Sequence, residues 1–235
     1  VEPVAGRAGA GCEALARFAD AGARPPSDWF NEAAEVGLGV ELEIAAIVNV
    51  LAAMPFVPAD HYISINASPE TVLSGQLEPL LKAANRPGLV IELTEHARVD
   101  DYGALRTALD GLRQYARIAI DDVGAGYSSL RHIIALEPDI LKLDMSLTRD
   151  VDTDPARRAL AGAMVNFASR IDASIVAEGI ERVEEADVLR ELGVTYGQGY
   201  LFSRPMPLVA AQQHMLGAVA EAAAPKPARK LRRAA

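Results

Sequence analysis

A unit of short apolar strand, polar residue and amphipathic helix recurs along the chain, and it restricts the fold more than any other feature. The six extended runs lie at 62–65, 89–91, 118–120, 140–143, 174–177 and 195–196, and each leads to a polar side chain and then to a helical pattern. The polar ends lie 20 to 36 residues apart, at Asn66, Glu92, Asp121, Lys142, Glu178 and Gln198. Units of this length are typical of paired strands and helices.

Two further strands are expected near the start of the chain, at 1–4 and 12–18, on either side of a Gly- and Ala-rich turn at 5–11. With the six later strands they make eight, the number that closes an α/β barrel of this length. The predicted fold class is therefore α/β, a (β/α)₈ TIM-like barrel. The main alternative is a doubly wound open sheet, which would not gather so many strand ends around one point.

Helices are predicted both before the first polar end and after each of the six polar ends. Ser27 or Asp28 is the expected N-cap of the first helix, which follows Pro25 and Pro26 and runs towards Gly37. The remaining helices are expected at 40–54, 69–84, 102–115, 128–135, 156–170, 183–192 and 208–219.

The composition is that of one globular domain with a full core. Of the 235 residues, 50% are hydrophobic and 23% charged. A net charge of −9 argues against non-specific binding to nucleic acid, which requires a basic surface. The single cysteine, Cys12, excludes an intrachain disulfide and a Cys-rich metal site.

No apolar run is expected to reach the roughly 18 residues that span a bilayer. We therefore predict no membrane contact in this segment and a barrel domain over 1–221, followed by a basic, disordered tail at 222–235. A membrane surface or an acidic partner is the alternative role for the tail. Because the chain begins at Val1 without an initiator Met, we expect it to be a piece of a longer protein.

The stretch from Ile118 to Leu130 combines a β-branched run, two adjacent carboxylates and two glycines. Neighbouring residues on a strand point to opposite faces, so Asp121 and Asp122 can surround one spot only where the strand ends. Two acids so close repel each other unless a cation lies between them. The alternative interpretation is an exposed acidic turn, since Asp-x-Gly sequences commonly form turns.

Seven oxygen-bearing side chains and one lysine are predicted at a single rim of the barrel. They are Glu13, Asn66, Glu92, Asp121, Asp122, Glu178 and Glu181, with Lys142. Burying so much negative charge unpaired is highly unfavourable, and divalent cations are the natural remedy. The ligand set is hard oxygen, which suits Mg²⁺ or Mn²⁺ better than Zn²⁺. The number of acids suggests two ions, an arrangement suited to hydrolysing phosphate esters.

Each of these residues also has a plain structural interpretation. A glutamate at a barrel rim is commonly a salt-bridge partner. Lys142 could pair only with Asp144, and Asn66 could cap the helix that begins near Pro69. The conjunction of these residues at successive strand ends favours the metal site over the separate structural roles.

The residues at these positions form blocks that resemble those of the EAL domain family, the cyclic di-GMP phosphodiesterases. The blocks, in family order, are Glu13-Ala14-Leu15-Ala16-Arg17, Trp29 to Gly37, Ile65 to Ser68, Glu92 to Glu95, Asp121 to Leu130, Leu141 to Asp144, Ala177 to Glu181, and Gln198 to Phe202 with Pro205. The likeness extends over nearly the whole chain.

The resemblance implies a barrel whose first strand is antiparallel to the others. It implies hydrolysis of one phosphodiester of cyclic di-GMP to linear pGpG, dependent on two Mg²⁺ or Mn²⁺ ions and inhibited by Ca²⁺. A non-hydrolysing cyclic di-GMP receptor is the alternative function. The resemblance also implies a cytoplasmic domain, although the full-length protein could be attached to a membrane.

Individual residues take their expected roles from the same resemblance. One ion is expected on Glu13, Asn66, Glu92 and Asp121, and the second on Asp122 and Glu178 with Asp121 shared. Lys142 matches the lysine that contacts the attacking water, while Glu181 and Gln198 match groups that orient water and ligands. Arg17 resembles a phosphate-contacting arginine. Leu15 and Pro205 are expected near the guanine bases.

The segment 122–129 resembles a loop that couples dimerisation to metal binding, with Glu95 as its anchor. Its residues after Asp122 are Val123, Gly124, Ala125, Gly126, Tyr127, Ser128 and Ser129. A homodimer through this loop and the adjacent helix is expected, as is an N-terminal sensory or GGDEF-type domain in the full-length protein. Val123 stands where the family usually has Phe, a departure expected to loosen the loop.

Overall fold

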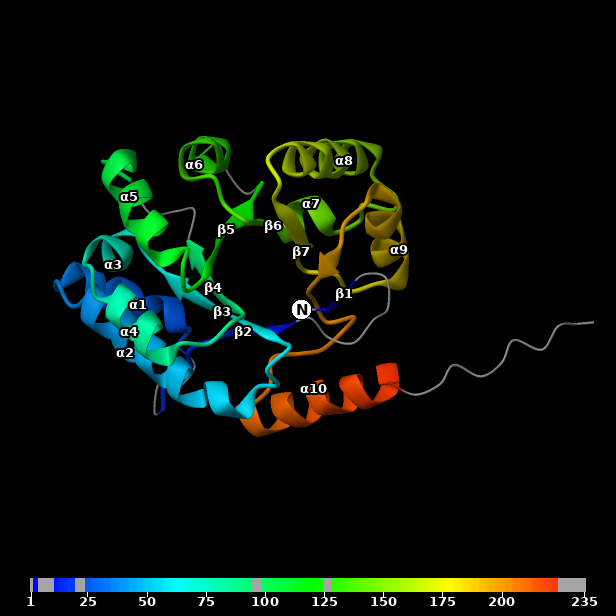
Figure 1. The fold of residues 1–235 in the computed structure, drawn as a ribbon. Helices are drawn as coiled ribbons and strands as arrows, with labels where there is room; N and C mark the ends of the chain where they lie inside the picture. Colours follow the sequence, from blue (N-terminus) through cyan, green and yellow to red (C-terminus); the bar gives the residue numbers. More distant parts are fainter. Residues whose placement is uncertain (1, 4–10, 20–23, 94–98, 125–127, 224–235) are drawn as a thin grey trace, which may run out of the picture.

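The computed structural model describes residues 2–3, 11–19, 24–93, 99–124 and 128–223. Eight strands form one sheet: β1 (Glu2–Pro3), β2 (Gly11–Ala14), β3 (Tyr62–Ala67), β4 (Leu89–Leu93), β5 (Arg117–Val123), β6 (Ile140–Leu143), β7 (Ser174–Ala177) and β8 (Tyr196–Gly197). Their order in the sheet is β1-β8-β7-β6-β5-β4-β3-β2. Each of β2 to β7 lies beside the next strand in the sequence, and the sheet curls into a barrel with its helices outside, as Figure 1 shows.

The strands β2 to β8 are parallel to their neighbours, as repeated strand–helix units require. The antiparallel direction expected for the first strand is seen only in the two-residue pairing of β1 with β8. Within the described residues no ladder joins β1 to β2, and the ring of hydrogen bonds has a gap there. The α/β barrel architecture is confirmed.

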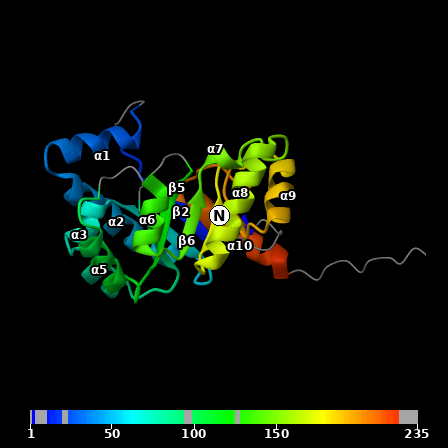
Figure 2. The ribbon, with the colours of Figure 1, turned by 90° about the horizontal axis from the view of Figure 1, so that it is seen from above.

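The helices alternate with the strands as predicted. They are α1 (Pro26–Glu35), α2 (Gly39–Ala53), the 3-10 turn η1 (Met54–Phe56), α3 (Pro69–Leu73), α4 (Leu77–Ala84), α5 (Tyr102–Leu112), α6 (Ser128–Leu136), α7 (Met145–Thr148), α8 (Pro155–Arg170), α9 (Val183–Leu192) and α10 (Leu208–Ala223). Helices α3 and α5 lie on the opposite flank of the barrel from α8 and α9 in both Figure 1 and Figure 2.

Several predicted boundaries were wrong. The single helix expected at 69–84 is two helices, separated at Gly75, whose φ of +73° is left-handed. Helix α7 was not predicted, because four residues are too few for a periodic pattern. The N-cap of α1 is Pro25, with no side-chain cap, and not Ser27 or Asp28. The second strand ends at Ala14 and does not reach residue 18.

The interior of the barrel has an apolar floor. Its side chains come from successive strands: Tyr62, Val90, Ala119, Ile140, Val176 and, partly buried, Tyr196. The residue two positions further along a strand points to the same face. Five of these floor residues are therefore followed by an inward charged or amide side chain: Glu92, Asp121, Lys142, Glu178 and Gln198. With Glu13 and Asn66 we call these residues the polar layer.

The larger hydrophobic core lies between the outer face of the sheet and the helices. Alternate strand residues such as Ile91, Ile120 and Leu141 pack there against helix residues such as Leu105 and Leu189. All five are almost completely buried. Because both faces of the parallel sheet are covered, its strands are apolar except where they reach the polar layer.

The stretch Gly39–Phe56, made of α2 and η1, is 18 residues long with a mean hydropathy of 1.6. By length and composition it could cross a membrane, which corrects the expectation that no run reaches this length. Only 11% of it is buried in the fold. One such helix is weak evidence for a membrane span, because the core helix of a soluble protein meets the same criterion.

Some predicted features lie outside the described residues. They are residues 5–10 of the N-terminal turn, the anchor residue Glu95, the loop residues Ala125, Gly126 and Tyr127, and the tail from residue 224. The predicted domain boundary between 221 and 222 falls inside α10, which continues to Ala223.

Candidate active site

Lys142 lies at the centre of the polar layer, with its ammonium surrounded by carboxylates. Its Nζ lies 2.7 Å from Glu92, 2.9 Å from Asp121, 2.9 Å from Glu178 and 3.5 Å from Glu13. Three of these acids come from β2, β4 and β5, Glu178 directly follows β7, and β6 supplies the lysine. The structure therefore gathers around one atom the acidic side chains that the sequence placed at separate strand ends.

The lysine is 2% exposed and stays charged because of its neighbours. Burial by itself favours the neutral amine. The four surrounding carboxylates outweigh burial and hold the pKa of Lys142 well above its ordinary value. Lys142 is thus a fixed positive charge inside the barrel.

One ammonium is too little to keep all of these acids ionised. Burial raises the pKa of Glu92 to about 7, although Lys142 opposes the shift. Burial likewise raises the pKa of Glu178 to about 8, and the negative charge of Asp121 adds to the effect. Both carboxyl groups therefore bind protons near neutral pH unless a further cation is present.

Glu13 differs because neutral side chains also donate hydrogen bonds to it. Asn66 Nδ2 donates to one oxygen at 3.1 Å, and Gln198 Nε2 donates to the other at 2.7 Å. Burial raises the pKa of Glu13, but Lys142 and these two donors together hold it below its ordinary value. The Gln198 Oε1 atom is buried and has no hydrogen-bond partner among the residues that the structure describes, so a ligand can bind it.

The two adjacent aspartates reach one side of the strand through a β-bulge. The pairing of β5 with β6 shifts register between Ile120 and Val123. Asp122 has a left-handed φ of +54°. Such a bulge re-aims side chains and is common beside active sites. Our expectation that the strand must end before Asp121 and Asp122 can converge was therefore wrong, since β5 continues to Val123.

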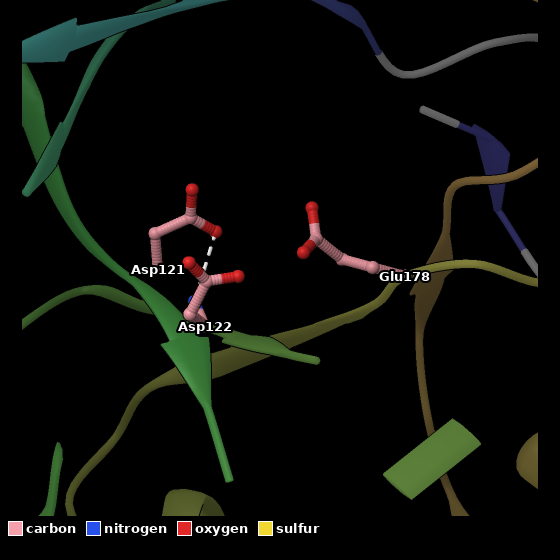
Figure 3. A group of neighbouring side chains, drawn as sticks. All are labelled: Asp121, Asp122 and Glu178. Carbon is pink, nitrogen blue, oxygen red and sulfur yellow. Dashed lines mark hydrogen bonds between the residues drawn. The ribbon is translucent and has the colours of Figure 1, made fainter. Parts of the chain in front are cut away.

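Asp121, Asp122 and Glu178 form a group of the kind that holds a metal ion. One carboxylate oxygen from each lies within 4.8 Å of the others. Figure 3 shows Glu178 facing the two aspartates, which stand side by side on β5, where the Asp122 backbone N–H donates to Asp121 Oδ1 at 3.0 Å. All three are partly buried and thus remain open to solvent on one side.

The charge and chemistry of these residues fit divalent metal ions. The five carboxylates of Glu13, Glu92, Asp121, Asp122 and Glu178 and the one ammonium carry a net charge of −4 when all are ionised. Two divalent cations would balance it. The donors are all oxygen atoms, which hard ions such as Mg²⁺ and Mn²⁺ prefer.

A cleft of about 490 Å³ opens next to the polar layer. Its walls include Glu13, Asp122, Glu178 and Gln198, so the acids face a space large enough for a small molecule. The remaining lining residues come mainly from the loops that follow β2, β6, β7 and β8. In barrels of this kind the site is built from such loops at the carboxyl ends of the strands.

A family model for the EAL domain matches residues 2–205. The chain belongs to the EAL domain family. The cyclic di-GMP phosphodiesterase PdeL of Escherichia coli K12 is 32% identical over 212 residues, which cover 84% of this chain and 58% of PdeL. The signaling protein YkoW of Bacillus subtilis 168 is 31% identical over 209 residues, covering 84% of this chain and 26% of YkoW. The chain thus spans less than two thirds of each of these relatives.

Solved EAL structures have the same fold. The EAL enzyme Bd1971, solved with cAMP and cyclic di-GMP bound, has a TM-score of 0.80 and 26% identity, covering 91% of this chain and 62% of Bd1971. BlrP1 of Klebsiella pneumoniae, solved with manganese and cyclic di-GMP at pH 6, has a TM-score of 0.73 and 30% identity, covering 83% of this chain and 51% of BlrP1. BlrP1 has also been solved with calcium and cyclic di-GMP.

The residues expected from the EAL resemblance to contact substrate are only partly brought together. Leu15 and Pro205 both line the cleft, and Leu15 is 45% exposed there. Glu181 lines it too and forms an ion pair with Arg149 at 2.7 Å. Arg17 is exposed, donates a hydrogen bond to the carbonyl of Ala16 and is not among the residues that line the cleft.

Two of the plain structural interpretations are excluded. Ser68, and not Asn66, caps α3, because its side chain accepts from the backbone N–H of Thr71. Asp144 caps α7 by accepting from Ser146 N, and the partners of Lys142 are the four acids of the polar layer.

Sequence reasoning missed several cleft residues. Tyr200 and Arg204 lie on the EAL segment around Gln198 and Pro205, and the Arg204 guanidinium stacks 4.2 Å from the centre of the Tyr200 ring. Met145 follows the strand that carries Lys142 by two residues. Because these residues lie close in the sequence to the EAL-like blocks, that proximity could have identified them as candidate cleft residues.

Proposed function

We propose that this EAL domain hydrolyses one phosphodiester of cyclic di-GMP to give linear pGpG, in a reaction that depends on divalent metal ions. The observation that carries the proposal is the meeting of five carboxylates and Lys142 at a cleft, in a chain whose relatives include PdeL, a cyclic di-GMP phosphodiesterase. The BlrP1 complexes that hold cyclic di-GMP with manganese or calcium support the same ligand and a metal site.

Glu13, Asn66, Glu92 and Asp121 would hold one ion in this proposal, and Asp121, Asp122 and Glu178 the other. The bound ions would polarise the phosphate and lower the pKa of an attacking water. Mg²⁺ or Mn²⁺ fits the oxygen ligands, and we expect Ca²⁺ to inhibit, because its longer bonds and looser geometry hold ligands less rigidly.

The chain's own groups have distinct tasks in the reaction. Lys142 provides a fixed positive charge that orients the attacking water and offsets negative charge on the phosphate in the transition state. Gln198 fixes Glu13 with its amide N–H, and its free carbonyl oxygen can accept from water. Leu15 and Pro205 provide the apolar surface on which a guanine base can lie.

The proposal is tested by incubating the purified protein with cyclic di-GMP and Mn²⁺ and separating products by chromatography. We expect pGpG from the wild type. Glu178→Gln should lower turnover by more than roughly 100-fold, because loss of groups that merely support a ligand costs 10–100-fold. Glu184→Gln, an exposed position on α9, is the matched control and should keep full activity. No pGpG from the wild type in Mg²⁺ or Mn²⁺ refutes the proposal.

The alternative of a non-hydrolysing receptor is not favoured. A receptor has no need of the complete set of metal ligands, and every predicted ligand is present in the polar layer or at its edge. Tight binding of cyclic di-GMP without pGpG in the same assay would select the receptor.

We further propose that the domain forms a homodimer through loop 122–129 and α6. On α6, Leu130 is 53% exposed and Ile134, one turn later, is 70% exposed, which gives an apolar stripe beside the strand that carries Asp121 and Asp122. Sedimentation should give a dimer for the wild type and a monomer for Ile134→Glu. Equal masses for the two proteins would remove α6 from the interface.

YkoW and PdeL extend well beyond the part that matches this chain. We therefore propose that the domain is the output part of a longer regulated protein, with an N-terminal sensory or GGDEF-type domain. A cytoplasmic location of the domain also stays a prediction.

A further inference from the structure

The loop at 178–182, which joins β7 to α9, carries three residues of the cleft. Glu178 belongs to the polar layer, while Gly179 and Glu181 line the cleft beside it. The position of this loop therefore decides where the Glu178 carboxylate stands relative to Asp121 and Asp122. Its own five residues cannot fix that position, because a loop is held by the partners of its backbone groups.

Glu185, on the first turn of α9, accepts hydrogen bonds from two backbone groups of this loop. Its Oε2 accepts from the N–H of Glu181 at 3.0 Å and from the N–H of Arg182 at 3.1 Å. The other oxygen, Oε1, accepts at 2.9 Å from the N–H of Asp150, which lies between α7 and α8. One side chain thus joins the loop to a segment about 30 residues earlier in the chain.

The Glu185 side chain is almost completely buried, with the residue 1% exposed. An ordinary capping box supplies one acceptor to the N-cap N–H of its own helix. Glu185 does this for Arg182 and also binds two further N–H groups, one of them from another element. Helix capping alone does not explain a buried carboxylate with three backbone donors.

Thr148, at the end of α7, holds the other end of the same loop. It is completely buried, and its hydroxyl donates to the backbone carbonyl of Glu178 itself. In the middle of the loop, the N–H of Ile180 donates to the carbonyl of Gln198 at 3.1 Å. Two buried polar side chains that take no part in the proposed reaction therefore converge on one cleft loop.

We propose that Glu185 is a positioning residue which, together with Thr148, clamps loop 178–182 and so sets the Glu178 carboxylate in the polar layer. The link to metal binding rests on the proposed function, whereas the clamping of the loop does not. Without the carboxylate, three backbone N–H groups lose their acceptor. The loop must then open to water to satisfy them, and Glu178 moves with it.

The test compares two shape-conserving variants, Glu185→Gln and Thr148→Val. The glutamine amide group turns a donor towards N–H groups that need an acceptor, and valine leaves the Glu178 carbonyl without its hydroxyl donor. Amide hydrogen exchange reports the loop directly, and calorimetric titration with Mn²⁺ reports the metal site. We expect exchange in 178–182 to speed up by at least about tenfold and Mn²⁺ affinity to fall roughly 10–100-fold.

Two controls separate positioning from general destabilisation. Thr148→Ser keeps the hydroxyl and should restore both exchange protection and Mn²⁺ affinity. Arg113→Met removes hydrogen bonds to the carbonyls of Leu136 and Glu137 on the far end of the barrel. It should lower the melting temperature without changing exchange in 178–182 or the affinity for Mn²⁺.

Unchanged exchange in loop 178–182 in both folded variants overturns the clamp. Faster exchange with unchanged Mn²⁺ affinity overturns the positioning role while keeping the clamp. If a variant does not fold, Glu185→Asp, which keeps the charge but shortens the reach, takes its place and is judged by the same two measurements. A wild type that binds no Mn²⁺ counts against the proposed function, and the exchange experiment still decides the clamp.

Discussion

Lys142 shows how one residue can be required for two different reasons. Its Nζ lies within 3.5 Å of four carboxylates, so it partly neutralises the acids even without a metal. In the proposed reaction the same charge acts on water and phosphate. A buried charge pair is costly to break, because the remaining partners are left without compensation.

We predict that Lys142→Met lowers the free energy of unfolding of the metal-free protein by about 3 kcal/mol, the low end for removing one partner of a buried ion pair. Added Mn²⁺ should recover much of this loss, since the ion supplies positive charge to the same carboxylates. Urea denaturation with and without Mn²⁺ measures both effects. Lys82→Met, at an exposed position on α4, should stay within about 0.5 kcal/mol of wild type. A metal-free Lys142→Met variant as stable as the wild type contradicts the prediction.

The raised pKa values of Glu92 and Glu178 predict a pH-dependent stability of the metal-free protein. Both start from an ordinary value of 4.5, and the folded values are about 7 and about 8. Between these limits the folded state holds protons that the unfolded state has released, so the free energy of unfolding falls as pH rises. The fall should begin near pH 5 and level off above about 8. Thermal melts in EDTA across this pH range measure the change in stability. The stability of Glu178→Gln should fall less steeply with pH than that of the wild type.

At the scale of the element, the bulge in β5 is what brings two adjacent carboxylates to the same site. A straight strand would point Asp121 and Asp122 to opposite faces. The register shift between Ile120 and Val123, with a left-handed Asp122, allows both carboxylates to approach Glu178. Gly124 directly follows the bulged strand and has a φ of +114°.

We predict that Gly124→Ala disturbs the metal site through this bulge. A side chain at this φ is strained, and its Cβ would collide with the side chain of Leu147. The strain should cost about 1–3 kcal/mol of stability, and Mn²⁺ affinity measured by calorimetry should fall as well. Gly75→Ala is the matched control. Gly75 also has a positive φ, of +73°, but a Cβ added there would have nothing within 4 Å. The control should lose stability only. An equal loss of Mn²⁺ affinity in both variants would argue against a role of the bulge in metal binding.

At the scale of the whole molecule, the polar layer concentrates repulsion at the carboxyl end of the barrel. The acids come from β2, β4, β5 and the loop after β7, so the charge balance in the polar layer affects how distant parts of the chain pack together. Metal ions that bind only the folded arrangement stabilise the entire domain by mass action.

We predict that free Mn²⁺ at 100 times its Kd stabilises the domain by about 2.7 kcal/mol. For a domain of this size the melting temperature should rise by roughly 5 to 10 °C, measured by calorimetry before and after EDTA. Glu13→Gln and Glu178→Gln should each reduce the rise, whereas Glu184→Gln should keep it. If Mn²⁺ does not change the melting temperature of the wild type, the proposed metal site is refuted.

The sequence alone was enough for the strand–helix order, the membership of the polar layer and the resemblance to EAL domains. The strand–helix order and the polar layer follow from local periodicity: apolar runs of strand length, a polar residue at the end of each, and helical patterns between them. The resemblance to EAL domains rests instead on the order of the sequence blocks. Even the bounds of β7 and α9 agree with the prediction, because each is flanked by clear polar or glycine signals.

Only the tertiary structure determined how these residues meet. The bulge at Asp122, the four partners of Lys142 and the attachment of loop 178–182 to Glu185 and Thr148 all depend on contacts between segments far apart in the chain. A period of two or of 3.6 residues describes one element at a time, so it carries no information on register shifts or on which buried donor finds which acceptor. Those are decided by packing, when the barrel closes and nearly all of its buried backbone polar groups must find partners.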